Sequence, residues 1–207
     1  MTRVKLADLA DVTFFCDPAS GRKVEVVKRV RARSAIVGVA HDWLDRIFVL
    51  VAWADRCRTD TLIEKIFEFN KLWKPRVFGC EANGLQSLFG DAVLREARFN
   101  GVSLPLTPVM QPTRVDKTWR IRTGLQPVIG SGRLFLQPEH VDLRTEIKDS
   151  PMSPTVDLID ALETAIRLLP PRASRRERDT EQDAYVQYLR DSGAPAAIIA
   201  LAARQPQ

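Results

Sequence analysis

Four acidic side chains stand at positions typical of a site for divalent metal ions. Asp17 follows the apolar run 12–16, Glu81 follows the run 76–80, and Asp157 and Asp160 begin the helical repeat 156–169. The carboxyl ends of neighbouring strands meet at one edge of an open α/β sheet, so Asp17 and Glu81 are expected within several ångströms of each other. Two carboxylates that close do not both stay ionised without a cation. Mg²⁺ prefers carboxylate and water oxygens, and two such ions about 4 Å apart support phosphodiester hydrolysis.

The pair Asp157 and Asp160 has two interpretations. At about 100° per residue their side chains lie about 60° apart on a helix, opposite its apolar stripe. That stripe consists of Leu158, Leu162, Ile166 and Leu169. Such a polar face is typical of a solvated helix surface. The alternative is an edge that faces the strand ends and adds hard oxygen ligands for two ions.

The elements that must position these acids are predicted by the apolar pattern of the first half. Short apolar runs rich in β-branched and aromatic residues predict strands, and apolar residues at helical spacing predict helices. The predicted strands are 12–16, 35–40, 47–54 and 76–80, and the predicted helices are 59–74, capped by Thr59 or Asp60, and 84–99. The first three strands form an antiparallel meander, and a strand that follows a crossover helix pairs in parallel. The fold class is therefore α/β, a mixed sheet with an antiparallel three-strand meander, parallel strands and flanking helices.

The second half is predicted to complete this domain and to end in a tail. Segments 103–110 and 131–137 are predicted as short strands, and segments 116–127 and 156–169 as helices. Pro170 and Pro171 end the last helix, and the polar stretch after them has the composition of a solvated linker. We expect one domain over residues 1–170, and a linker and helical tail over residues 171–207.

Composition excludes several classes of protein. The chain has 207 residues, a net charge of +5 and three cysteines. Cys16, Cys57 and Cys80 are widely spaced, which supports neither a disulfide framework nor a zinc knuckle. No stretch has the length and apolar character of a membrane span or a secretory signal. A reducing cytoplasm is expected.

At this point the sequence resembles a known family. Segments FFCDPAS, FGCEANG, KTWRI and PTVDLIDALETA, over residues from about Leu9 to Leu169, are similar to the RNase H-like nuclease domain of tailed-phage large terminase subunits. The resemblance implies a metal-dependent endonuclease that cuts concatemeric viral double-stranded DNA during genome packaging. By motif position it implies that Asp17, Glu81 and Asp160 bind two Mg²⁺ or Mn²⁺ ions, with Asp157 as an auxiliary catalytic acid. Thr155 and Val156 stand where the family often has His and Asp.

The same resemblance suggests partners. Large terminases carry an ATPase domain with a phosphate-binding G-x-x-x-x-G-K-[ST] loop, which this chain lacks, so we expect an excised or separately encoded nuclease domain. The portal, the small terminase subunit and the cytoplasm of a bacterial host follow as expectations. No membrane partner is expected.

Basic residues are candidates for phosphate contacts. They form one cluster near the N-terminus and a pair beside KTWRI, where a structural role is the alternative. The candidate DNA-binding residues are Arg22, Lys23, Lys28, Arg29, Arg31, Arg33, Lys117 and Arg120. His41 and His140 are isolated and are interpreted as surface residues. The tryptophans Trp43, Trp53, Trp73 and Trp119 are interpreted as packing residues, because no aromatic run alternates with basic residues.

Two other functions fit the same pattern. A Holliday-junction resolvase or transposase-like nuclease uses similar acids on the same fold, and it would prefer branched DNA. A non-catalytic module of a packaging motor would dock through its C-terminal tail and would not need metal at the acids.

Overall fold

The computed structural model describes residues 9–19, 33–42, 44–84, 86–112, 114–170, 185–193, 195, 196, 198 and 200. The chain divides into two compact units, Met1–Pro170 and Pro171–Gln207. Within the second unit, residues 185–191 are helical. No described helix is long and apolar enough to cross a membrane.

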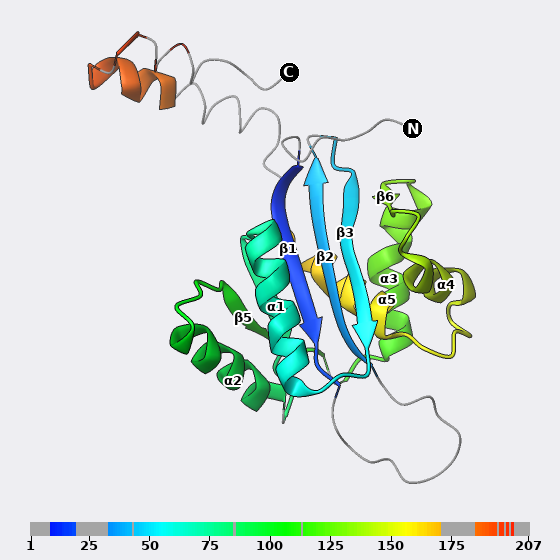
Figure 1. Ribbon diagram of the computed structural model, residues 1–207. Helices are drawn as coiled ribbons and strands as arrows, with labels where there is room; N and C mark the ends of the chain where they lie inside the picture. Colours follow the sequence, from blue (N-terminus) through cyan, green and yellow to red (C-terminus); the bar gives the residue numbers. More distant parts are fainter. Residues whose placement is uncertain are drawn as a thin grey trace. The chain divides into compact units, whose positions relative to one another are not determined.

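The first unit is built on a sheet of six strands in the order β5-β4-β1-β2-β3-β6 (Figure 1). The strands are β1 (Leu9–Asp17), β2 (Ser34–Asp42), β3 (Ile47–Asp55), β4 (Val77–Glu81), β5 (Leu106–Val109) and β6 (Leu134–Phe135). Strands β1, β2 and β3 pair antiparallel, whereas β4 pairs in parallel with β1 and β5, and β6 in parallel with β3. The mixed α/β sheet predicted from the sequence is therefore confirmed.

Helices α1 (Thr59–Trp73) and α2 (Gln86–Phe99) cover one face of the sheet. Strand alternation turns Phe14 and Phe78 to this face, where their rings stack with centroids 5.3 Å apart. Gly38 on β2 lies against the Phe14 ring, which leaves no space for a side chain. Helix α1 starts after Arg58, so the predicted caps, Thr59 and Asp60, lie inside its first turn.

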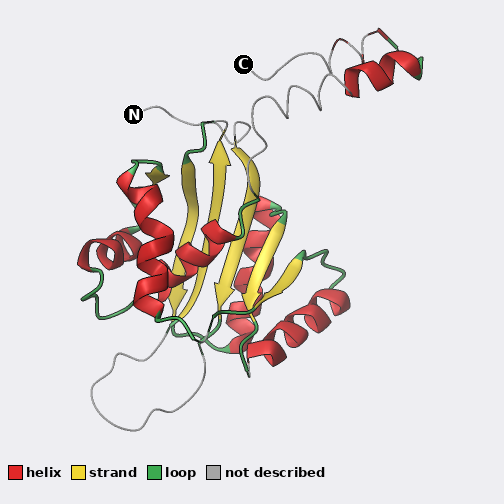
Figure 2. Ribbon diagram, turned by 180° about the vertical axis from the view of Figure 1, so that it is seen from behind, coloured by secondary structure: helices red, strands yellow, loops and turns green. Residues whose placement is uncertain are grey.

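Helices α3 (Lys117–Gly130), α4 (Val141–Asp149) and α5 (Asp157–Arg167) cover the other face (Figure 2). Helix α5 packs on β1 and β2 and is flanked by α3 and α4. Its residues from Leu158 to Ala165 are all buried, which excludes the interpretation of a solvated face for Asp160. Helix α4 was not expected from the sequence, because its nine residues carry few apolar positions.

Candidate active site

Asp17 and Glu81 lie side by side because β1 and β4 are parallel neighbours. The register pairs Cys16 with Cys80, and the next residue of each strand is one of the two acids. Alternation along the strand puts Asp17 on the same face as Phe15, which packs in the core beneath α5. The strand-end placement expected from the sequence therefore brings these two carboxyls together on the face that α5 covers.

The surroundings of Asp17 disfavour the charged form of its carboxyl group. Burial raises the pKa of its carboxyl well above the usual value, and a hydrogen bond with Glu81 and the repulsion between the two charges raise it further. Asp160 also raises this pKa, whereas Lys117 lowers it. A cation bound beside these carboxyls would oppose the rise in the pKa of Asp17.

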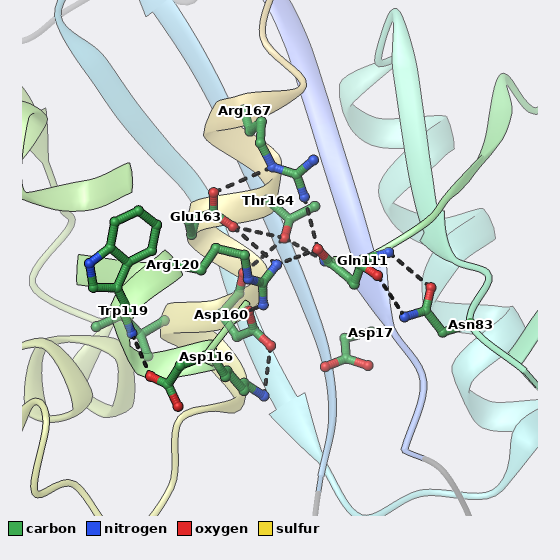
Figure 3. A network of polar contacts seen from close by, with 12 residues as sticks. Asp17, Asn83, Gln111, Asp116, Trp119, Arg120, Asp160, Glu163, Thr164 and Arg167 are labelled. Carbon is green, nitrogen blue, oxygen red and sulfur yellow. Dashed lines mark hydrogen bonds and ion pairs between the residues drawn. The ribbon is translucent and has the colours of Figure 1, made fainter. Parts of the chain in front are cut away.

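Asp160 reaches the same place from α5 and is only 5% exposed. Lys117 Nζ lies 2.6 Å from Asp160 Oδ2, and Arg120 donates a hydrogen bond to Oδ1. Burial lowers the pKa of Lys117, but the charge and hydrogen bond of Asp160, aided by Asp17 and Asp157, leave it above its usual value. We call Asp17, Glu81, Lys117 and Asp160 the strand-end cluster. Figure 3 shows Asp17 beside Asp160, at the open end of a polar network.

Arg120 joins this cluster to a network that sequence reasoning missed. Arg120 donates to Gln111 Oε1 and, over 3.3 Å, to Glu163 Oε2. Gln111 Nε2 donates to Thr164 Oγ1 over 2.7 Å, and Arg167 donates to Gln111 Oε1 over 2.8 Å. Burial raises the pKa of Glu163, although Arg167 and Arg120 oppose the rise. The network fixes α5 against the ends of the strands.

The loops after β4 and β5 are tied together next to Glu81. Asn83 Oδ1 accepts a hydrogen bond from the Gln111 backbone N–H over 2.9 Å, and Asn83 Nδ2 donates to the Gln111 carbonyl over 3.1 Å. Gln86 Nε2 donates to the Pro18 carbonyl over 3.1 Å and lies 3.5 Å from Asp17 Oδ1. The Asn83-Gly84 step, which has a positive φ at Gly84, was the available sequence signal for this turn.

Asp157 belongs to a second set of charges, which we call the Arg33 cluster: Arg33, Asp142, Glu146, Thr155 and Asp157. Arg33 makes ion pairs of 2.8 Å with Asp142 and 2.7 Å with Glu146, and its Nε lies 3.5 Å from Asp157. The Arg33 backbone N–H also donates to Asp157 over 3.3 Å. The structure therefore places Asp157 one turn from Asp160 but directs its carboxylate to Arg33.

The candidate DNA-binding residues fall into three groups. Arg22, Lys23, Lys28, Arg29 and Arg31 lie outside the described residues. The Arg33 side chain is 17% exposed and is occupied by three carboxylates. The Arg120 side chain is 11% exposed and serves the polar network, whereas Lys117 is 47% exposed and adjoins the acids.

Three residues differ in burial from what the sequence predicted. His41 and His140 were interpreted as surface residues and are buried, at 4% and 7% exposure. His41 Nε2 donates a 3.1 Å hydrogen bond to the Asp11 carboxylate, which accounts for the burial of His41. Trp119 was interpreted as a packing residue and is 61% exposed. All three cysteines are free.

The donor set suits a hard divalent cation. Among the described residues, no three acidic, histidine or cysteine side chains form a ready-made metal cage. In the strand-end cluster, Lys117 and Arg120 form ion pairs with Asp160, whereas Asp17 and Glu81 have no ion pair with any described residue. Carboxylate oxygens that repel one another in a half-buried site match the preference of Mg²⁺ and Mn²⁺, and a doubly charged ion would relieve that repulsion.

Comparison with known proteins gives structural matches only. No protein-family profile and no curated protein sequence matches the chain. The nuclease domain of the P22 large terminase superposes with a TM-score of 0.51 at 12% identity, covering 76% of this chain and 81% of that one. A variant nuclease domain of the large terminase subunit of bacterial virus Sf6, solved with manganese, has a TM-score of 0.50 at 9% identity, covering 80% and 90%.

A third match is the RuvC protein of Thermus thermophilus in complex with a Holliday junction substrate. Its TM-score is 0.42 at 14% identity, covering 75% of this chain and 90% of that one. At these identities the matches establish architecture alone. The described chain has the RNase H-like fold that the P22 and Sf6 nuclease domains display.

Proposed function

We propose that this protein is a metal-dependent DNA endonuclease of the RNase H-like type. The observation that carries the proposal is the convergence of Asp17, Glu81 and Asp160, from two strand ends and one helix, on a single half-buried point. A fold keeps three mutually repelling carboxyls together at a cost in stability, and perturbed groups of this kind concentrate at functional sites.

Asp17, Glu81 and Asp160 would hold two Mg²⁺ or Mn²⁺ ions. When bound, such a pair supplies a nucleophilic water and stabilises the leaving oxygen of a phosphodiester. A bound cation would lower the raised pKa of Asp17 and so favour its carboxylate form as a ligand. Asp157 has a minor share, because Arg33 occupies its carboxylate.

The basic residues of the site have two roles in this proposal. Arg120 holds Asp160 toward the strand ends through the network with Gln111 and Glu163. Lys117, nearly half exposed, contacts the phosphate beside the scissile bond. The residues Arg22, Lys23, Lys28, Arg29 and Arg31 are proposed to add backbone contacts, which makes binding weakly sequence-selective and salt-dependent.

We further propose that the substrate is concatemeric viral double-stranded DNA and that cutting takes place during genome packaging, in a bacterial host's cytoplasm. The support is the similarity of fold to the P22 and Sf6 terminase nuclease domains, together with the DPA and DLIDA motifs around Asp17 and Asp160. A terminase ATPase domain, the portal and the small terminase subunit are the expected partners.

The test is cleavage of supercoiled plasmid in Mn²⁺ with and without chelator. Wild type should nick and linearise the plasmid only when the ion is present, and Glu81→Gln should reduce the rate at least about a hundredfold. Glu64→Gln, at an exposed position of α1 on the opposite face, is the matched control and should cut normally. Equal cutting by wild type and Glu81→Gln would refute the proposal, and strong preference for four-way junctions over linear duplex would favour the resolvase reading.

A further inference from the structure

Trp119 is an exposed aromatic residue on a fixed backbone. Trp119 is 61% exposed, whereas Trp53 and Trp73 are partly buried. The Trp119 backbone N–H donates to Asp116 Oδ1 over 2.8 Å, and its carbonyl accepts from Thr123 Oγ1 over 2.8 Å. A tryptophan at this position is therefore not explained by packing in the core. These two hydrogen bonds fix its backbone, while the ring faces solvent.

The position of Trp119 relates it to the strand-end cluster. It lies in the first turn of α3, two residues after Lys117 and one before Arg120, and both of these bind Asp160. Residues two apart on a helix have Cα atoms about 5.4 Å apart. Figure 3 shows the ring projecting away from the polar network while Arg120 turns into it. Trp119 therefore shares one helical turn with the two residues that bind Asp160, while its ring faces another side of that turn.

The surroundings of the ring suit a nucleic acid strand. Arg114 and Arg122 are exposed and lie within five residues of Trp119 in the chain. Neither has an ion pair or side-chain hydrogen bond with any residue that the structure describes. Asp116, three residues before Trp119, is the N-cap of α3 and accepts the Trp119 backbone N–H. An aromatic ring flanked by free cations is the arrangement with which proteins stack bases and track the backbone of an unpaired strand.

Given the proposed nuclease function, on which this step rests, we propose that Trp119 stacks on a nucleobase that is unpaired or unstacked next to the scissile phosphate. The faces of paired bases are covered by their neighbours, so an indole reaches one only where the step is opened or kinked. Trp119 is then a specificity-determining residue, and the substrate class is DNA whose duplex is locally opened at the cut site.

The cleavage test compares a fully paired duplex with the same duplex carrying a central mismatch bubble. Wild type should cut the bubble duplex at least about tenfold faster in kcat/KM, and Trp119→Ala should lose about tenfold on the bubble and little on the paired duplex. Trp119→Phe should restore most of the preference, because it keeps an aromatic face. Phe99→Ala is the matched control, since Phe99 is 86% exposed at the far end of α2, and it should behave as wild type. Equal preference in wild type and Trp119→Ala would overturn the proposal.

A binding test separates this inference from the proposed function. Bubble DNA titrated into the Glu81→Gln variant should quench tryptophan fluorescence, and the additional substitution Trp119→Phe should remove most of the quenching. Quenching that is unchanged by Trp119→Phe would overturn the stacking role whether or not the protein cuts DNA. If stacking is observed but no metal-dependent cleavage is, the base contact stands and the nuclease assignment fails.

Discussion

The first two turns of α5 carry two acids in opposite situations. Asp157 points to the Arg33 cluster, in which one arginine faces three carboxylates and buried Glu146 also accepts the Ile159 backbone N–H over 2.9 Å. Asp160 points to the strand-end cluster, in which burial, Glu81 and Asp160 itself raise the pKa of Asp17. Every acid of the Arg33 cluster has an ion pair with Arg33, whereas Asp17 and Glu81 have none with any residue that the structure describes.

This difference separates a structural role from a chemical one. The Arg33 cluster connects α4 and α5 to the residue that precedes β2, and its ion pairs are completed within the protein. In the strand-end cluster, burial and the neighbouring acids raise the pKa of Asp17, and a bound cation would lower it. Neighbouring acids of the same helix therefore cannot be assigned one role from their spacing.

The largest expected effect is on cleavage and distinguishes the two acids directly. Asp160→Asn should reduce plasmid cutting at least about a hundredfold, because it removes an oxygen ligand from the ions. Asp157→Asn should reduce it less than about tenfold, because that carboxylate is held by Arg33. Single-turnover rates in Mn²⁺ measure both, and a greater loss with Asp157→Asn would invert the comparison.

The next effect is on stability and tests the Arg33 cluster. Arg33→Met should lower the free energy of unfolding by about 3 kcal/mol, because it leaves Glu146, only 2% exposed, without its counter-charge. Urea unfolding followed by circular dichroism measures this change. Arg144→Met, at an exposed position of α4, is the control and should cost less than about 0.5 kcal/mol.

A double variant checks the cause. Glu146→Gln keeps an acceptor for the Ile159 N–H and removes the buried charge, so adding it to Arg33→Met should recover part of the lost stability. No recovery would indicate that packing of the arginine stem, and not charge, connects these elements.

A smaller effect follows from the raised pKa of Asp17 in metal-free protein. Its folded pKa lies above the ordinary value of 3.8, so between the two values the folded state binds a proton that the unfolded state has lost. The stability of wild type relative to Asp17→Asn should therefore fall as pH rises through this window, and Asp17→Asn should melt a few degrees higher at pH 8. Thermal melts from pH 4 to 8 in chelator test this, and parallel curves would contradict it.

The smallest effect concerns the contact of α3 with α5. A Cβ at Gly124 would lie 2.8 Å from Glu163 Cγ, so Gly124→Ala must displace a side chain that binds Arg120. We expect cutting to fall severalfold with stability within about 1 kcal/mol of wild type, because the gain in helix propensity offsets the crowding. Gly90→Ala on α2 meets nothing within 4 Å and should raise stability without changing cleavage.

The sequence predicted the sheet, and the positions of Asp17 and Glu81 at the ends of two strands, for a physical reason. Runs such as 12–16 and 76–80 are apolar because both faces of those strands are covered, and the residue after each run is where a strand end meets the edge. The contacts of Gln111, Glu163 and Arg167 could not be predicted, because they depend on how α3 and α5 cross. The periodicity placed Asp160 on the polar face of its helix. It could not show that residues of α3 pack over Asp160 and bury it.

The predictions that Trp119 packs in the core and that the two histidines lie on the surface were wrong for a related reason. A tryptophan in a helical pattern is usually buried, and only the geometry of the first turn of α3 shows the ring turned outward. His41 pairs with Asp11, thirty residues away in the chain, through a strand pairing that isolated spacing does not reveal.

The most direct test of the central claim is a crystal soaked in Mn²⁺ and measured for anomalous scattering. The account predicts strong peaks bounded by Asp17, Glu81 and Asp160, with Lys117 displaced from Asp160, and no peak within the Arg33 cluster. A well-ordered crystal whose three acids stay paired as described and bind no manganese at saturating concentration would contradict it.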